Sequence, residues 1–307
     1  MEFKKITLDD RELFLNYYKS NPQYASYKSF ANLFIWRNFE DIRYGLVDGH
    51  IVITGELTPG NHTYFLLPQT EKAGMQAVTE HLFQEYGKKF RLSCLTKEQK
   101  ELLEELYPEK FDFSYDRNSD NYYYSTEALA TLAGKKLHGK RNHINKFKSL
   151  YQWEYIHLDH EAAMECVDIA KDWCKQKNCE KDAVLRNEVK GCIEALNHME
   201  ELNLKGGAIR VDGTIVAFSL GERLNEETAL IHIEKANTDY QGAYTIINNE
   251  FVKNEWADTK YINREEDLGI EGLRKAKLSY NPAILLEKYS ATLLSETEEI
   301  TELEQGD

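Results

Sequence analysis

Residues 205–236 read KGGAIRVDGTIVAFSLGERLNEETALIHIEKA, and the rest of the chain can be organised around this stretch. Asp212-Gly213 separates two runs rich in apolar and β-branched residues, a pattern typical of a tight β-hairpin. A third such run covers 229–236, and the turn 237–242 leads from it into a helical pattern that begins at Ala243. The stretch therefore predicts a hairpin, a further strand and a helix, in that order.

A similar order of elements occurs in the first half of the chain, around the turn Asp48-Gly49. There the patterns predict strands at 42–47, 50–54 and 63–68, a helix at 75–86 and a strand at 90–94. After the helix of the second half they predict a strand at 261–263, a helix at 268–278 and a last strand at 283–289. The two halves share element order but no sequence identity. We therefore expect an α/β fold of the α+β type, with a mixed sheet in each half.

The length of 307 residues allows two domains of about 150 residues each. We expect a first domain over 1–125 and a second domain, with any active site, over 126–290. The remaining residues, 291–307, are acidic and carry little apolar periodicity, so we expect a tail there.

Composition excludes several classes of protein. No stretch approaches the ~18 uncharged apolar residues that a membrane span needs, and the first residues lack the apolar core of a signal peptide. The net charge of −14 argues against a protein that coats nucleic acid. Five cysteines without regular spacing predict reduced thiols. We expect a cytoplasmic protein without a transmembrane segment.

Positive charge is concentrated between Gly134 and Lys148, where no acid occurs. Helical patterns at 127–137 and 141–150 flank Gly139, at which we expect a break. Such a segment can bind a tRNA acceptor stem or an anionic lipid surface. The alternative is a basic helix that packs on an acidic surface of the same protein. The residues expected to bind a polyanion are Lys136, Lys140, Arg141 and Lys146.

Candidate catalytic groups occur in the strand at 229–236. Strict alternation places Leu230, His232 and Glu234 on one face of it. The alternative for His232 and Glu234 is a pair whose partners lie under the sheet.

The turn and helix start after this strand contain Gln241, Gly242, Ala243 and Tyr244. Free N–H groups and the positive end of the helix dipole at such a position suit an anion such as pyrophosphate. The alternative is a plain connection between strand and helix, with Gly242 serving only the turn.

A second group of polar residues follows the strand at 261–263. Asn263 and Asp267 lie in a loop crowded with charge, and Arg274 and Lys277 lie three apart on one face of the next helix. Arginine can bind a phosphate or carboxylate through two hydrogen bonds, with lysine as a point charge beside it. The alternative is a solvated helix face paired with nearby acids.

We expect no metal site. Cys166, Cys174, Cys179 and Cys192, taken with His198, could be drawn as one, but no Cys-x-x-Cys spacing is present. Three of these cysteines fall in long helical patterns, so core thiols are the better explanation.

Several segments resemble the uncharacterised bacterial family named after the phosphatidylglycerol lysyltransferase C-terminal domain. The most specific is NREEDLG at 263–269. The others are SFANLFIWR at 29–37, KLHGKRNHINKF at 136–147, HIEKA at 232–236, GLRKAK at 272–277 and YNP at 280–282. The resemblance covers nearly the whole chain.

The resemblance implies a tandem pair of GNAT-like (acyl-CoA N-acyltransferase-type) domains, related to Fem-type and other aminoacyl-tRNA-dependent transferases. It implies that the second domain holds the donor, that Gln241-Gly242-Ala243 binds phosphate, and that Lys277 stabilises phosphate or developing charge. The donor-binding residues expected on this basis are Gln241, Gly242, Ala243, Tyr244, Asn263 and Arg274.

Enzymes of this class transfer an acyl group directly to an amine or hydroxyl, without a covalent enzyme intermediate. They need a base for the acceptor, a dipole at the carbonyl and a cation at the leaving group. The expected catalytic residues are Glu234 as base, or else His232 or Asp267, together with Lys277. The expected donor is a coenzyme A thioester or an aminoacyl-tRNA, with no tightly bound cofactor. The alternative function is a non-catalytic ligand-binding module that kept the fold.

Overall fold

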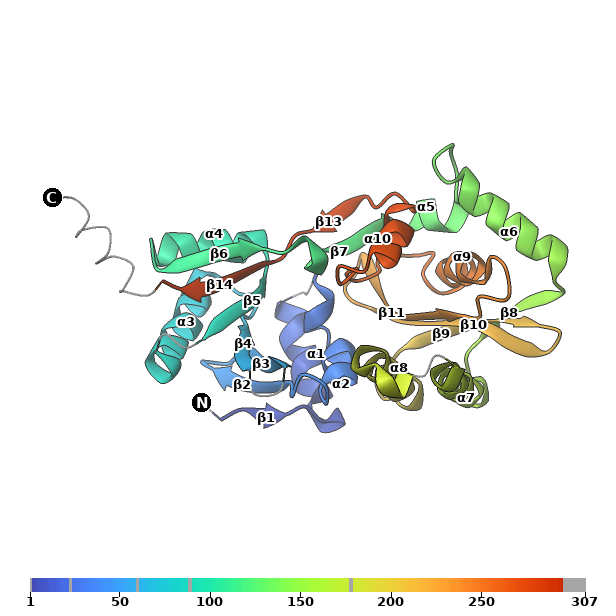
Figure 1. The fold of residues 1–307 in the computed structure, drawn as a ribbon. Coiled ribbons are helices and arrows are strands. Elements are labelled where there is room, and N and C mark those ends of the chain that lie inside the picture. The colour runs from blue at the N-terminus through green and yellow to red at the C-terminus, as the bar shows by residue number, and fades with distance from the viewer. Residues whose placement is uncertain (1, 22–23, 59–60, 88–89, 177–178, 295–307) are drawn as a thin grey trace. The chain divides into compact units, whose positions relative to one another are not determined.

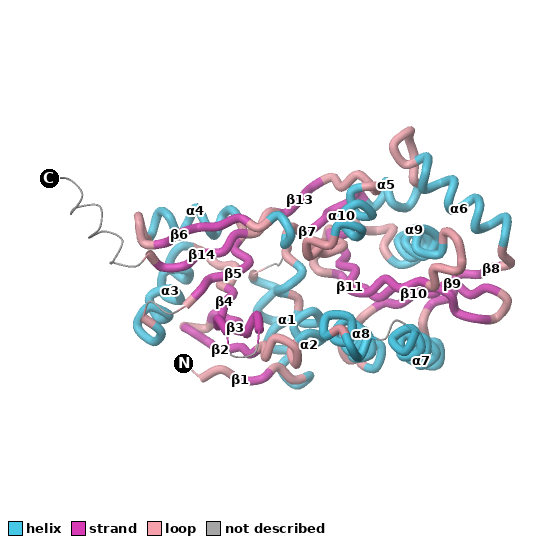
Figure 2. The backbone as a smooth tube through the Cα atoms, viewed as in Figure 1, coloured by secondary structure: helices cyan, strands magenta, loops and turns pink. Residues whose placement is uncertain are grey.

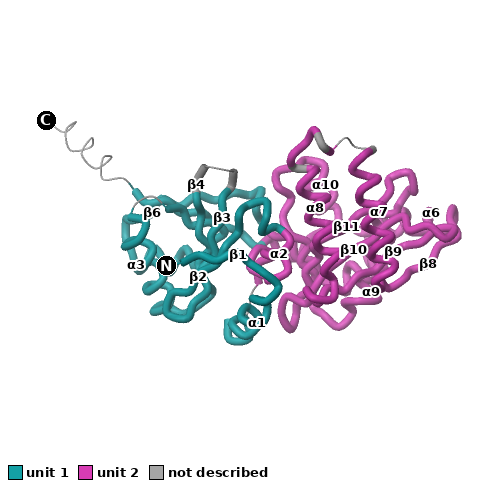
Figure 3. The backbone as a smooth tube through the Cα atoms, turned by 90° about the horizontal axis from the view of Figure 1, so that it is seen from below, with its two compact units in different colours: residues 1–22, 36–120, 286–307 teal, residues 23–35, 121–285 magenta. Residues whose placement is uncertain are grey.

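The computed structural model describes residues 2–21, 24–58, 61–87, 90–176 and 179–294. Contacts between residues divide the chain into two compact units, which Figure 3 distinguishes by colour. Unit 1 comprises 1–22, 36–120 and 286–307, and unit 2 comprises 23–35 and 121–285. The consecutive domain bounds 1–125 and 126–290 stay a prediction.

Unit 1 contains a mixed sheet and the helices that cover it (Figure 1). In spatial order its strands are β1 (Lys4–Lys5), β2 (Arg43–Val47), β3 (His50–Thr58), β4 (Asn61–Leu66), β5 (Arg91–Leu95), β14 (Tyr289–Leu293) and β6 (Phe111–Tyr115). Its helices are η1 (Leu8–Asp10), α1 (Arg11–Ser20), α3 (Lys72–Tyr86), α4 (Lys97–Leu106) and η3 (Arg117–Ser119). Met75, Val78 and Leu82 of α3 are fully buried at helical spacing and form a core with strand residues such as Phe65 and Leu92.

Unit 2 contains a second mixed sheet with helices on both faces (Figure 2). In spatial order its strands are β8 (Trp153–His157), β9 (Lys205–Val211), β10 (Thr214–Arg223), β11 (Thr228–Ala236), β12 (Tyr261–Asn263), β7 (Asn121–Ser125) and β13 (Ile284–Leu286). The helices are η2 (Ser26–Lys28), α2 (Phe30–Trp36), α5 (Thr126–Thr131), α6 (His138–Leu150), α7 (His160–Gln176), η4 (Cys179–Lys181), α8 (Ala183–Asn197), α9 (Ala243–Glu255) and α10 (Glu271–Leu278).

The helix α9 is the central helix on one face of this sheet. Its Ile246, Ile247 and Phe251 are buried against strand residues such as Ile209 and Val216. The helices α5 and α6 pack beside α9 on that face, and α7 and α8 cover the opposite face (Figure 1). The chain runs from the carboxyl end of β11 into α9, and from that of β12 into the loop that precedes α10.

The two sheets share one topology. Strands β1 to β5 and β8 to β12 follow the same order, antiparallel up to the fourth strand, and the pairs β4–β5 and β11–β12 are parallel. Each sheet also takes in a strand from a distant part of the chain: β14 lies between β5 and β6, and β7 lies between β12 and β13. The prediction of a mixed α/β arrangement built twice is confirmed.

Expectations about single elements differ from the structure in three places: the last strand, the start of the tail and the break at Gly139. The last strand, expected at 283–289, is two strands, because the chain leaves β13 at Leu286 and pairs again from Tyr289 in β14. Residues 291–293 of the expected tail belong to β14, and 295–307 lie outside the described residues. Gly139 lies inside α6, so the helix is not interrupted there. The break falls earlier, where Leu132 and Gly134 adopt left-handed φ values of 50° and 82°.

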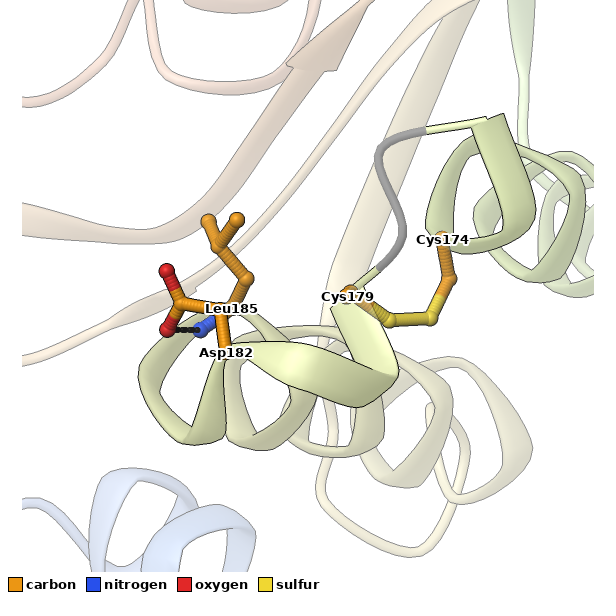
Figure 4. Close-up of a disulfide and its surroundings, with 4 residues drawn as sticks. All are labelled: Cys174, Cys179, Asp182 and Leu185. Carbon is orange, nitrogen blue, oxygen red and sulfur yellow. Dashed lines mark hydrogen bonds between the residues drawn. A yellow bond between two sulfur atoms is a disulfide. The ribbon is translucent and has the colours of Figure 1, made fainter.

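The cysteines also differ from expectation. Cys174 near the end of α7 forms a disulfide with Cys179 in η4, so the prediction of reduced thiols is wrong for this pair (Figure 4). Cys166 and Cys192 are buried thiols of the core, and burial raises the pKa of Cys192 to about 12. Within the described ranges we find no helix whose length and hydropathy would let it cross a membrane.

Candidate active site

The strand β11 contains a β-bulge at His232. Ile231 pairs with Gly221 of β10 and Ile233 pairs with Leu220, so His232 is an extra residue without a partner position on β10. One inserted residue reverses the face on which every later side chain lies.

The bulge determines the position of Glu234. Ile231 before the bulge and Ala236 after it both belong to the core under α9, although strict alternation would place them on opposite faces. Glu234 accordingly reaches α9, where Asn248 donates a hydrogen bond to it. Leu230 and Glu234 therefore lie on opposite faces, contrary to the expectation from alternation.

Glu234 forms an ion pair with Arg264, which follows β12. Arg264 Nη2 lies 2.8 Å from Oε1, and Asn248 Nδ2 lies 3.0 Å from Oε2. The guanidinium packs over the rings of Tyr280 and Tyr124, whose centroids are 4.9 and 5.6 Å away. Because the two charged side chains are only 13% and 12% exposed, salt screens the pair weakly. A carboxylate accepts about four hydrogen bonds, so Glu234 keeps capacity for a substrate.

Lys140 points into this site from α6. It lies at i, i+4 and i+7 spacing with the buried Ile144 and Phe147, on the packed face of the helix. Its Nζ lies 3.8 Å from the ring centroid of Tyr280 and has no hydrogen bond or ion pair within the described ranges. Burial and the nearby Arg264 lower the pKa of Lys140 to about 8. The spacing with Ile144 and Phe147 was the sequence signal that this lysine faces inward.

The loop after β12 holds every group that the sequence marked as catalytic. Its backbone is left-handed at Glu265 and Leu268, with φ values of 56° and 52°, which non-glycine residues rarely adopt outside constrained sites. Consecutive residues of the loop each bind one of these groups or its partner. The pairs are Arg264 with Glu234, Glu265 with His232, the Glu266 carbonyl with Lys277, and Asp267 with Arg274.

Asp267 is fully buried and accepts four hydrogen bonds. Arg274 donates through Nε at 2.8 Å and Nη2 at 2.7 Å, and the Tyr122 hydroxyl and the Gly269 amide supply the others. Burial raises the pKa of the carboxyl, but the bonds from Arg274, Tyr122 and Gly269 outweigh it and hold the pKa well below its usual range. All acceptor positions are therefore in use, and Asp267 stabilises the loop.

Lys277 is also directed inward. Its Nζ donates to the backbone carbonyls of Arg264 and Glu266, and the residue is 7% exposed. Burial lowers the pKa of Lys277 to about 8, opposed by the charge of Glu266. An ammonium has three hydrogens, so two are used on the loop.

His232 lies between two carboxylates. Its Nε2 is 2.9 Å from Glu222 and its Nδ1 is 3.0 Å from Glu265, and the side chain is 1% exposed. Burial lowers the pKa of His232, but the hydrogen bonds to Glu222 and Glu265 outweigh it and raise the pKa to about 9. At neutral pH both ring nitrogens donate, so this histidine is charged and cannot accept a proton.

The His232 arrangement predicts that stability falls at alkaline pH. The pKa in the folded state, about 9, is above the unfolded value of about 6.5, so the contribution is complete below pH 6.5. Protonated His232 contributes about 3 kcal/mol to the free energy of unfolding, and this contribution is lost as the pH rises towards 9. Urea unfolding at pH 6 and pH 9.5 should show this loss in the wild type and in His160→Gln, an exposed control. An equal loss in His232→Asn would contradict the assignment.

The helix start after β11 is not open in the expected way. The amides of Ala243, Thr245 and Ile246 donate to backbone carbonyls of the same turn, and Gln241 N lies 3.3 Å from the Tyr151 hydroxyl. Gly242 has a φ of 95°, and a Cβ there would lie 2.8 Å from the carbonyl oxygen of His143 in α6. The backbone of α6 thus approaches the start of α9 closely.

Tyr244 and Asn263 differ in their access to solvent. Tyr244 is 41% exposed, and it lies one turn before Asn248 on α9. Asn263 is fully buried, donates to Asn121 Oδ1 at 3.3 Å and accepts from the Glu265 amide at 2.8 Å. Asn263 therefore holds the loop in place.

The four residues expected to bind a polyanion have separate surroundings. Lys140 faces the site described above, and Arg141 Nη1 donates to the carbonyls of Leu132 and Gly134. Lys136 and Lys146 are exposed.

Of this set, Lys136 and Lys146 are therefore the residues expected to contact a polyanion at the exposed surface, whereas Lys140 faces the site. Each phosphate contact contributes about −0.7 to −0.9 to the slope of log K against log salt, so the slope for tRNA should be no steeper than about −1.4 to −1.8 from these residues. Lys136→Glu with Lys146→Glu should remove that slope, and the double change Lys171→Glu with Lys175→Glu on α7 is the control. A slope that is unchanged in the Lys136/Lys146 variant would exclude these residues from binding.

The sequence and the fold of this chain are similar to those of several known proteins. The family defined by the C-terminal domain of phosphatidylglycerol lysyltransferases matches residues 18–292. A conserved protein of unknown function from Bacteroides thetaiotaomicron is 39% identical, with a TM-score of 0.88 over 96% of this chain and 100% of that chain. An uncharacterised protein of Mycoplasmoides gallisepticum is 26% identical over 175 residues, which are 56% of this chain and 56% of that curated relative.

Two further solved structures share the fold at low identity. The C-terminal domain of a putative lysylphosphatidylglycerol synthetase from Agrobacterium fabrum has a TM-score of 0.66 and 13% identity, over 96% of this chain and 95% of that chain. FemX has a TM-score of 0.59 and 9% identity, over 99% of both chains. The fold is thus the tandem GNAT-like arrangement that the family resemblance implied.

Proposed function

The chain belongs to the phosphatidylglycerol lysyltransferase C-terminal family, and on that premise we propose that it is an acyl- or aminoacyltransferase. It moves the group from a phosphate-containing donor, a coenzyme A thioester or an aminoacyl-tRNA, to an amine or hydroxyl acceptor. The fold shared with FemX and with a putative lysylphosphatidylglycerol synthetase supports this class of activity.

The observation that carries the proposal is the meeting of Glu234, Arg264 and Lys140 where β11 and β12 end. The carboxylate of Glu234, which can accept further hydrogen bonds, lies beside these two cations, and both cations pack against the ring of Tyr280. Direct acyl transfer needs these functions: a base that takes the proton of the acceptor, and positive charge near the leaving group.

The roles of the four expected catalytic residues separate on this basis. Glu234 is the proposed base, since Asp267 has all its acceptor positions filled and His232 carries its protons already. Asp267 and His232 are positioning residues that hold the loop after β12. Lys277 keeps its proposed role as a cation near the donor, with one N–H beyond those bound to the loop.

The alternative is a ligand-binding module without catalysis. The saturation of Asp267 and His232 favours it, because groups fixed by strong partners serve binding and stability as well as they serve a reaction. A module would bind the donor and leave it intact.

Two linked measurements test the proposal. Mass spectrometry of the denatured protein identifies a co-purified donor or product. Incubation with acyl-coenzyme A or with aminoacyl-tRNA, in the presence of an amine or hydroxyl acceptor, then measures the loss of the thioester or ester. Consumption of one donor with formation of an acylated acceptor supports the transferase, and stable binding of an unchanged donor supports the module.

A further inference from the structure

Two buried polar atoms next to Glu234 have no hydrogen-bond partner among the residues that the structure describes. They are Oδ1 of Asn248 and Nη1 of Arg264, and Asn248 is 2% exposed. In the same two groups, Asn248 Nδ2 and Arg264 Nη2 already donate to Glu234. Buried polar groups in folded proteins are nearly always paired, so an acceptor and a donor left open beside one carboxylate indicate a place for a ligand.

The ammonium of Lys140 adds a second open donor. It is half-buried against the ring of Tyr280, and no carboxylate within the described ranges pairs with it. Burial and the nearby Arg264 lower its pKa to about 8. Glu234 neutralises only one of the two cations, so the group is positive overall and attracts an anion.

The helix start of α9 is a weaker anion site than this group. The amides of Ala243, Thr245 and Ile246 are used within the turn, and the α6 backbone lies against Gly242. Lys140 comes from that same helix α6. The helix that crowds the start of α9 therefore supplies a lysine to the neighbouring group.

We propose that Lys140, Arg264 and Asn248 form the subsite for a phosphate group that carries or adjoins a hydroxyl. Lys140 Nζ and Arg264 Nη1 donate to the phosphate oxygens, and Asn248 Oδ1 accepts from the hydroxyl. The subsite deepens the proposed function and rests on it for its biological meaning, since a nucleotide donor has this chemistry. A glycerol phosphate head group of a lipid has it as well, and the two sources are separated by experiment.

The test uses isothermal titration of the full chain at constant ionic strength. The probes are adenosine 5′-monophosphate, glycerol 3-phosphate, inorganic phosphate and sulfate. Sulfate matches phosphate in shape and charge but carries no hydroxyl at neutral pH, so it leaves Asn248 Oδ1 unpaired. We expect sulfate to bind about tenfold more weakly than phosphate. Tighter binding of the nucleotide than of glycerol 3-phosphate identifies the source as the donor, and the reverse order identifies a lipid head group.

Variants of Lys140 locate the binding. Lys140→Met keeps the apolar stem on Tyr280 and should weaken each phosphate probe about tenfold or more, because a charge-assisted bond is lost. Lys140→Arg should retain affinity within about threefold, and Lys171→Met on α7, an exposed control, within about twofold. Lys140→Gln carries the same test if the Met variant does not fold.

The inference is overturned if Lys140→Met binds phosphate as the wild type does, if sulfate binds as tightly as phosphate, or if the wild type binds no phosphate probe. Its failure is separable from that of the transferase. If binding depends on Lys140 but no transfer is detected, the subsite is supported and the transferase proposal fails. If Lys140→Met transfers the group with an unchanged KM for the donor, the transferase proposal is supported and the subsite fails.

Discussion

Glu234→Gln is expected to lower the rate of acyl transfer by about 10² to 10⁴, the usual contribution of a general base. The amide keeps the size of the side chain and can still accept from Arg264 through its oxygen, but it takes up no proton. Because Gln can keep the hydrogen bond from Arg264, which ties β11 to the loop after β12, donor affinity should change much less than the rate. Single-turnover kinetics with the donor in excess of its dissociation constant measure the chemical step directly.

The matched control for this variant is Glu271→Gln in the first turn of α10, where the carboxylate is exposed. Its transfer rate should equal that of the wild type. A Glu234→Gln protein with a rate within about threefold of the wild type would rule out proton transfer to Glu234, given the magnitude expected of a base.

Arg274→Ala is expected to lower the free energy of unfolding by about 3 to 5 kcal/mol. The change leaves the carboxylate of Asp267, which is fully buried, without its counter-charge. Unfolding in urea can be followed by tryptophan fluorescence, since Trp153, Trp173 and Trp256 all lie in unit 2. Signal from unit 2 should therefore dominate the transition.

Two further variants test whether the uncompensated charge of Asp267 causes this loss of stability. Lys275→Ala changes an exposed neighbour on α10 and should stay within about 0.5 kcal/mol of the wild type. Adding Asp267→Asn to Arg274→Ala should recover part of the stability, because the amide has no charge to compensate. If the double variant is less stable than Arg274→Ala, the loss does not come from an uncompensated charge.

The local elements of the fold were predictable because they depend on nearby residues. Asp48-Gly49 and Asp212-Gly213 both form hairpin turns with positive φ, at 49° and 82° and at 49° and 83°, as Asp-Gly pairs favour. The strand and helix that follow each hairpin also lie where apolar periodicity placed them.

Features that depend on distant residues were not predictable in this way. The pairing of β14 with β5 and β6 joins residues far apart in the chain, and a local pattern at 283–289 cannot show where the chain leaves one sheet for another. The bulge at His232 depends on its register with β10, so alternation alone misplaced Glu234.

For the candidate site too, the residue types were predictable from the sequence, whereas the contacts between distant residues were not. The sequence identified the loop 263–269 and the acidic and basic residues that meet there, because their types are those that bind anions and protons. It did not show that Asp267 and His232 are saturated by their partners, since saturation depends on Arg274, Tyr122 and Glu222 in space. Lys140 was assigned to a surface stretch by its charge, whereas its spacing with Ile144 placed it inside.

The most direct test of the account is a crystal structure with an amide-linked analogue of the donor identified by mass spectrometry. Such an analogue keeps the acyl and phosphate groups but resists transfer. The account predicts that its phosphate contacts Lys140 and Arg264 and that its acyl carbonyl lies within reach of Glu234. An analogue bound at the start of α9, or anywhere away from Glu234, would contradict the assignment of the active site.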